Sequence, residues 1–128
     1  MKNRILADTS VWIEFFRLKS SVGGRLETLL AENSVWLCGV ILFELLQGVR
    51  SGDEKRLILE ALSDMKYIEM TQSHWKKAAE LSAYLKKKGL NLPQSDILIA
   101  SLAIDHDLQV FTLDKHFEQI PGIRIYKA

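Results

Sequence analysis

Short β-prone runs recur along this chain, and segments long enough for helices separate most of them. The runs cover residues 4–7, 35–38, 67–70, 109–112 and 124–126. Strands that alternate with helices pair in parallel, because each helix returns the chain to the same end of the sheet. The sequence therefore predicts an α/β fold, in which a central, mostly parallel sheet of about five strands has helices on both faces.

Apolar residues at helical spacing predict helices within residues 22–33, 53–65 and 71–89. Gly23 and Gly24, near the start of the first segment, are expected to shape a turn before its helix. These segments supply the surface helices that connect the predicted strands.

Two further segments, residues 40–48 and 96–105, are apolar almost all round, which is typical of helices packed inside a domain. Each nevertheless carries an acid, and Glu44 is the more informative of the two. Glutamate is among the residues least often buried, so something must compensate its charge. An ion pair with Arg50 or Lys55, or a helix face open to solvent, would do so without any functional role.

The length of 128 residues and the hydrophobic content of 48% fit one compact domain over residues 1–128. Cys38 is the one cysteine of the sequence, so an intramolecular disulfide is excluded and a place in the core is expected. A net charge of +1 argues against binding nucleic acid by bulk electrostatics alone. No secretory signal or membrane-span pattern is recognisable, so we expect a cytoplasmic protein.

Four acids lie where an open parallel sheet binds its ligands, outside the carboxyl ends of the strands. Asp8 and Asp114 closely follow predicted strands, and Asp96 lies in the first turn of its helix. Glu44 lies within about two turns of the start of the helix that follows another strand. Each acid alone has a plain explanation as a helix cap or a surface charge, but their joint placement predicts one pocket.

Four carboxylates in one pocket cannot all stay ionised unaided, since two unit charges ~4 Å apart repel by about 4 kcal/mol at an effective dielectric constant near 20. A bound cation removes that repulsion. Oxygen ligands select hard ions, so Mg²⁺ or Mn²⁺ is expected rather than zinc. His74, His106 and His116 are scattered along the sequence, and none has zinc-ligand spacing.

With these four acids in this order, the sequence resembles a PIN-domain ribonuclease of the VapC toxin type over essentially its whole length. The matching motifs are LADTSVWIE around Asp8, ELLQG around Glu44, LPQSDILIASLA around Asp96 and VFTLDKHFEQIPGI around Asp114. The first and third motifs are the most specific. The resemblance implies a PIN-like three-layer fold and an enzyme that acts on RNA.

The resemblance assigns Asp8, Glu44, Asp96 and Asp114 to the catalytic metal site, with Ser10 and Thr112 as nearby hydroxyls that orient a ligand or water. It implies an endoribonuclease that needs Mg²⁺, with Mn²⁺ as a substitute, and hydrolyses phosphodiester bonds without a covalent intermediate. Some members of the family carry a further acid just before the phenylalanine that here is Phe117. This chain has His116 in that place, which leaves open whether one or two ions bind.

The resemblance also implies three partners: an RNA substrate, a small VapB-like antitoxin that covers the pocket, and a second copy of the chain. The homodimer would join the antitoxin in a higher hetero-oligomer. The segment after Asp8 forms a large apolar surface with Trp12, Phe15 and Phe16. This surface could bind a partner in a groove or could equally well belong to the ordinary core. Basic residues that could contact RNA phosphates are Arg17, Arg50, Lys55, Arg56 and Lys115.

Two alternatives compete with a nuclease. A phosphoacceptor receiver-like signalling domain would use Asp8 and Lys115, but it requires an aspartate after the third strand, where this chain has MTQS. It also leaves Glu44 unexplained. A non-catalytic PIN-like module that binds RNA or protein would keep the fold and use the acids only as helix caps.

Overall fold

In the described part of the chain, strands and helices follow one another as the sequence predicts. Strand β1 (Ile5–Ala7) leads to helices α1 (Thr9–Arg17) and α2 (Ser21–Ala31). Next come β2 (Val35–Cys38), α3 (Gly39–Gln47), α4 (Gly52–Leu62), β3 (Lys66–Ile68) and α5 (Gln72–Lys87). The last elements are α6 (Gln94–Asp105), β4 (Gln109–Phe111) and the short 3-10 helix η1 (Lys115–Gln119).

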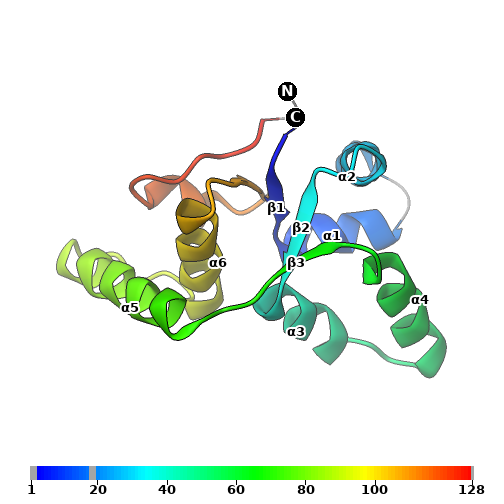
Figure 1. The fold of residues 1–128 in the computed structure, drawn as a ribbon, viewed down its shortest axis with the longest axis horizontal. Helices are drawn as coiled ribbons and strands as arrows, with labels where there is room; N and C mark the ends of the chain where they lie inside the picture. Colours follow the sequence, from blue (N-terminus) through cyan, green and yellow to red (C-terminus); the bar gives the residue numbers. More distant parts are fainter. Residues whose placement is uncertain (1–2, 18–19, 128) are drawn as a thin grey trace.

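The computed structural model describes residues 3–17 and 20–127. Its strands form a parallel sheet in the order β3-β2-β1-β4, so that β1, the first strand, lies inside the sheet. Helices α5 and α6 lie on one side of the sheet, and α1, α2 and α4 lie on the other (Figure 1). The predicted α/β class and three-layer arrangement are therefore confirmed.

The sheet of the described residues has four strands where the sequence predicts about five. The predicted strand at residues 124–126 is reduced to one parallel bridge between Ile125 and Val110. Both backbone hydrogen bonds of this bridge use Val110, whose N–H donates to Arg124 and whose carbonyl accepts from Tyr126. The segment follows a turn at Gly122, where φ is 83°, and Ile125 alone among its described residues pairs with β4.

Helices α1 and α2 approach closely at Gly23. Gly23 and Gly24 lie inside α2, so the turn predicted for them is wrong. Ser20 begins the helix instead, because its side chain accepts a hydrogen bond from the Gly23 N–H at 3.0 Å. A Cβ atom on Gly23 would lie 2.8 Å from the Glu14 carbonyl oxygen, whereas a Cβ on Gly24 would meet nothing within 4 Å.

The two segments predicted to pack inside the domain differ in their burial. Helix α6 buries most of its residues, including Ile99, Ala100 and Leu102. Helix α3 buries Ile41 and Leu45 but leaves Phe43 66% exposed, so the prediction of an interior helix is wrong for that face of α3. Across residues 3–17 and 20–127, no helix combines the length and the apolar character that crossing a membrane requires.

The core lies on both faces of the sheet, against α6 on one side and α1 on the other, where Trp12 is fully buried and stacks on Phe16 with ring centroids 5.9 Å apart. Phe15 and Phe16 are half-buried and pack against the core. The core interpretation therefore holds for Trp12, while the two phenylalanines keep part of their surface open. Cys38 is fully buried, as predicted, and burial raises the pKa of its thiol.

The contrast between the two glycines of α2 gives a test of the α1–α2 packing. We expect Gly23→Ala to lower the free energy of unfolding by roughly 1–3 kcal/mol, because its methyl group meets the backbone of α1. Gly24→Ala should raise it by about 0.5–1 kcal/mol, because alanine is the better helix former and the space is open. Urea unfolding of both variants measures the difference, and equal changes would contradict the close approach.

Candidate active site

Asp8 directly follows the last residue of β1, and hydrogen bonds hold both its backbone N–H and its carboxylate. Its backbone N–H donates to Phe111 at 2.9 Å, which extends the β1–β4 ladder by one bond. Oδ1 accepts hydrogen bonds from the Ser10 N–H at 3.0 Å and from the Ser10 hydroxyl, and Oδ2 accepts one from the Thr112 hydroxyl at 2.5 Å. Asp8 therefore begins α1, as the helix-cap alternative predicts, and also lies at the carboxyl edge of the sheet.

Asp114 reaches the same edge from β4. The Thr112 hydroxyl, which donates to Asp8, accepts a hydrogen bond from the Asp114 N–H at 2.9 Å. The Asp114 carboxylate accepts from the His116 N–H at 2.9 Å and thereby begins η1. Thr112 thus links the Asp8 carboxylate, after β1, to the Asp114 backbone, after β4. The Ser10 hydroxyl adds a second link by accepting a hydrogen bond from the Leu113 N–H at 3.1 Å.

Asp96 enters from the first turn of α6 and meets Asp114 through a histidine. His116 Nδ1 lies 3.2 Å from Asp96 Oδ2 and 3.0 Å from Asp114 Oδ1. One donor atom from each of these three residues lies within 4.8 Å of the others, a grouping that could hold a metal ion. No side chain caps α6, so the free amides of its first turn add positive potential beside Asp96.

Burial perturbs two of the carboxyl groups. Asp8 is 5% exposed and Asp96 is 9% exposed. Burial raises the pKa of Asp8, and the hydrogen bonds from Ser10 and Thr112 partly oppose the rise. Burial also raises the pKa of Asp96, to which the negative charges of Asp114 and Asp8 contribute further. Two buried acids that repel each other are typical of a site that holds a cation.

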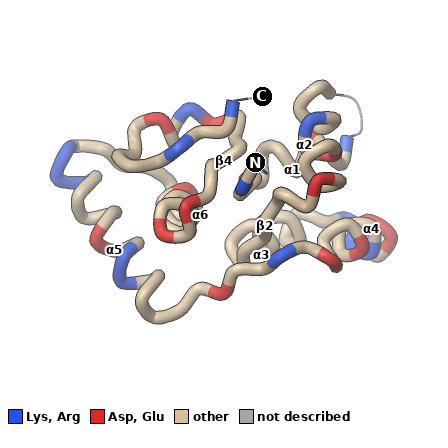
Figure 2. The backbone as a smooth tube through the Cα atoms, turned by 45° about the horizontal axis from the view of Figure 1, so that its top comes forward, with Lys and Arg blue, Asp and Glu red and all other residues tan. Residues whose placement is uncertain are grey.

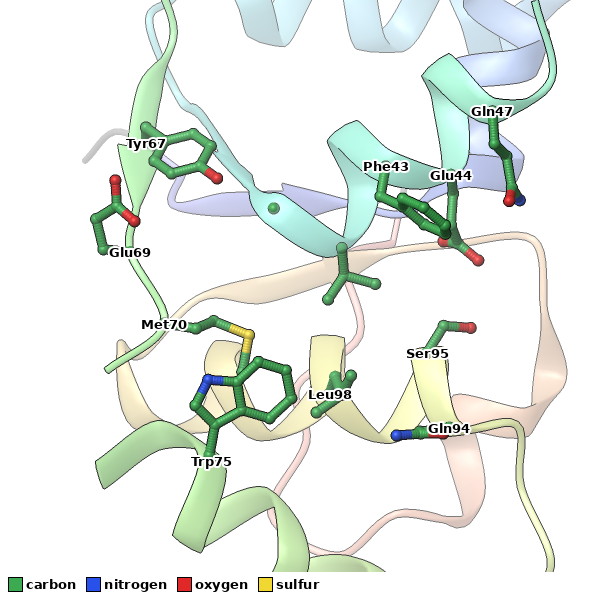
Figure 3. A pocket seen from close by; sticks show the side chains of 12 residues that line it. Phe43, Glu44, Gln47, Tyr67, Glu69, Met70, Trp75, Gln94, Ser95 and Leu98 are labelled. Atoms are coloured by element: carbon green, nitrogen blue, oxygen red, sulfur yellow. The ribbon is translucent and has the colours of Figure 1, made fainter. Parts of the chain in front are cut away.

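Glu44 lies beside this cluster and faces a cavity of its own. Its Oε1 accepts a hydrogen bond of 2.7 Å from the hydroxyl of Thr9, the residue that follows Asp8. The cavity, of about 490 Å³, also borders Gln94 and Ser95 at the start of α6. Figure 3 shows Glu44 on α3 facing Ser95 across this space. Glu44 forms no ion pair with another described residue, so the predicted pairing with Arg50 or Lys55 is wrong.

The basic residues predicted as phosphate contacts are spread over the molecule. Arg17 is paired with Glu14, and Arg56 with Asp53 in α4. Acidic and basic residues alternate along α4 and α5 (Figure 2). Lys115 is exposed and directly follows Asp114, so it is next to one of the four acids in the sequence.

Sequence reasoning named the acids and both hydroxyls, and the fold brings Asp8, Asp96 and Asp114 to one edge, with Glu44 beside them. Their role as metal ligands stays a prediction. The sequence prediction missed the contact of Thr9 with Glu44 and the contacts of His116 with Asp96 and Asp114. The signals were the adjacency of Thr9 to Asp8 and the position of His116 two residues after Asp114.

Comparisons with known proteins find similar chains along nearly the whole length of this one. "VapC ribonuclease Mb1587" of Mycobacterium bovis is 27% identical over 97% of this chain and 96% of its own length. "Ribonuclease VapC1" of Methanocaldococcus jannaschii is 28% identical over 98% of this chain and 88% of its own length. The DNA-bound VapBC structure from Salmonella typhimurium includes a chain with the same fold, with a TM-score of 0.83, 24% identity and 97% of both chains covered.

A match to a whole domain family bears on the receiver-like alternative left open by the sequence. The family model described as PIN domain matches residues 5–123, a range that contains every acid of the site. This match does not favour the receiver-like alternative. From strand β1 to the last turn, the chain belongs to the PIN-domain family.

Proposed function

We propose that this protein is a metal-dependent endoribonuclease, a toxin of the VapC type that hydrolyses RNA phosphodiester bonds. The observation that carries the proposal is the convergence of Asp8, Asp96 and Asp114 from three separate segments at one sheet edge. Two of these acids are buried, which is costly for folding and favours a functional reason for keeping them. Relatives named ribonucleases match nearly the whole chain, which supports the same chemistry here.

The donor atoms at the site fit a hard divalent cation, which we take to be Mg²⁺ with Mn²⁺ as a substitute. Carboxylate oxygens of Asp8, Asp96, Asp114 and Glu44 would hold it, and such oxygens suit these ions. When bound, the cation neutralises charge on the phosphodiester and lowers the pKa of water, so that the attacking nucleophile forms near neutral pH.

The protein supplies orientation and charge around that cation. The hydroxyls of Ser10 and Thr112 fix both oxygens of Asp8, so the carboxylate is oriented before RNA arrives. His116 Nδ1 lies 3.2 Å from Asp96 Oδ2 and 3.0 Å from Asp114 Oδ1, so a proton on this atom would reduce the repulsion between the two carboxylates. Thr9 fixes the Glu44 carboxylate beside the start of α6.

A second cavity adjoins the site and suits a protein partner. It has a volume of about 420 Å³ and is lined by Ile13 and Phe16 of α1, by Leu57 of α4 and by Glu44. Ile13 is 43% exposed and Leu57 is 63% exposed, which leaves apolar surface uncovered next to the acids. We propose that a small VapB-like antitoxin covers it. We also propose that the toxin forms a homodimer within a larger assembly and acts in the cytoplasm.

Removal of one central carboxylate tests the proposed activity. We expect Asp96→Asn to lower the cleavage rate of a mixed structured RNA pool in Mg²⁺ by at least ~100-fold, because the variant loses a charge that holds the cation. Asp53→Asn, the same change at an exposed position on α4, should keep the wild-type rate. Chelator should abolish cleavage by the wild type.

The opposite results would contradict the proposal. Full cleavage by Asp96→Asn would show that the Asp96 carboxylate is not needed for the reaction. Cleavage by the wild type in chelator would show that the reaction does not need a metal ion. No cleavage by the wild type in any metal, together with no calorimetric Mg²⁺ binding, would favour the non-catalytic binding module.

The raised pKa of Asp8 gives a second, independent prediction about stability. Because burial raises this pKa above its unfolded value, the folded protein binds the proton more tightly than the unfolded chain. In chelator, the Asp8 contribution to stability is therefore largest at acidic pH and falls as pH rises from the unfolded pKa through the raised folded pKa. We expect Asp8→Asn, which removes the buried charge, to be more stable than the wild type at neutral pH and to lose that advantage at low pH.

Urea unfolding in chelator at several pH values measures this difference. A destabilised Asp8→Asn at neutral pH would show that the carboxylate stabilises the fold as a helix cap by more than its burial costs.

A further inference from the structure

A second group of metal-ligating side chains lies at the far end of α6 from Asp96. His74, in the first turn of α5, meets Asp105 and His106 at the carboxyl end of α6. His74 Nε2 lies 3.0 Å from His106 Nε2 and 3.1 Å from Asp105 Oδ2. His74 lies 32 positions before His106 in the sequence, and the packing of α5 against α6 brings it to the adjacent Asp105 and His106.

The separations suit a tetrahedral transition metal. Bonds of about 2.0–2.1 Å to zinc place neighbouring ligand atoms roughly 3.3 Å apart. The two observed separations, 3.0 and 3.1 Å, lie within a few tenths of an ångström of that value. Two imidazole nitrogens with one carboxylate oxygen also form a softer donor set than the acids near Asp8, and this set favours Zn²⁺ or Co²⁺ over Mg²⁺.

Hydrogen bonding accounts for the same contact when no metal is bound. His74 Nδ1 accepts from the Thr71 N–H at 2.9 Å, so the proton of neutral His74 is on Nε2 and points toward His106 and Asp105. A metal ion would replace that proton. The proton then moves to Nδ1, where the Thr71 hydroxyl lies 3.1 Å away as an acceptor, and the N–H of exposed Thr71 is free to bind water.

The surroundings already orient the three donors. His74 is 9% exposed, and the Thr71 hydroxyl lies 3.1 Å from its Nδ1, where it can accept the proton of a metal-bound ring. Lys77 binds Asp105 Oδ1, which leaves Oδ2 for a metal, and Arg4 donates to the His106 carbonyl oxygen at 2.8 Å. Such outer contacts are what metal sites use to position their ligands.

We propose that His74, Asp105 and His106 form a second metal site, which takes Zn²⁺ or a similar transition metal and pins the start of α5 to the end of α6. Three protein ligands leave the fourth position to water. The site is separate from the acids near Asp8 and does not depend on the proposed ribonuclease activity.

Zinc binding to protein without a polyhistidine tag tests the proposal, and the third histidine supplies a matched control. His106→Gln removes a donor from the proposed site, whereas His116→Gln makes the same change among the acids. After chelator treatment and dialysis, Zn²⁺ is added to each variant and followed by calorimetry and by thermal unfolding. We expect His116→Gln to bind zinc with a rise in Tm, and His106→Gln to bind it at least ~10-fold more weakly with no such rise.

Cobalt gives a readout at the ligands themselves. In His116→Gln, Co²⁺ should produce the strong visible bands of a four-coordinate ion, and the ring protons of His74 and His106 should show paramagnetic shifts in NMR spectra. His106 is half-exposed at the helix end, so far-ultraviolet circular dichroism should confirm that His106→Gln folds. Equal zinc affinity in the two variants, or no zinc binding by His116→Gln, would overturn the proposal.

Discussion

The parallel pairing of β1 with β4 is the contact on which the rest of the site depends. It places Ile5 opposite Gln109 and Ala7 opposite Phe111, and the Asp8 N–H extends the same ladder. Because both strands run in the same direction, the residues that follow them emerge at the same edge. The hydrogen bond between Thr112 and Asp8 therefore joins side chains 104 positions apart in the sequence. A one-residue slip in this register would turn these side chains to opposite faces.

The acids at this edge combine two opposing electrostatic effects. Burial favours the protonated forms of Asp8 and Asp96, and the charges of Asp114 and Asp8 add to this effect at Asp96. Hydroxyl and amide donors favour the ionised form of Asp8, and the hydrogen bond with His116 favours that of Asp96. Without a cation, the first turn of α6 supplies positive potential, and His116 Nδ1 contacts both Asp96 and Asp114. Carboxylates that are already oriented and have little competing hydration bind a divalent cation more readily than a fully solvated cluster does, which supports the proposed metal site.

Local patterns in the sequence were sufficient to predict the strands at 35–38 and 109–112 and the position of Asp8 after β1, because each depends on short runs of residues. Local patterns failed where the structure depends on contacts between residues that are distant in the sequence. Gly23 lies within a helix that Ser20 caps and that α1 approaches closely at this residue, and residues 124–126 pair with β4 at one point, after a turn at Gly122. The pairing of His74 with His106 has no local signal, since it arises only when α5 packs on α6.

Two of the acids have structural duties as well as chemical ones. Asp8 binds the first amides of α1, and Asp114 binds the His116 amide at the start of η1. Glu44 lies in the middle of α3 and begins no helix, and its side chain contacts Thr9. Replacements at Asp8 or Asp114 therefore alter a helix start together with the chemistry. For the proposed ribonuclease activity, an inactive form for trapping bound RNA is better sought at Glu44, where the backbone has no share in the carboxylate's contacts.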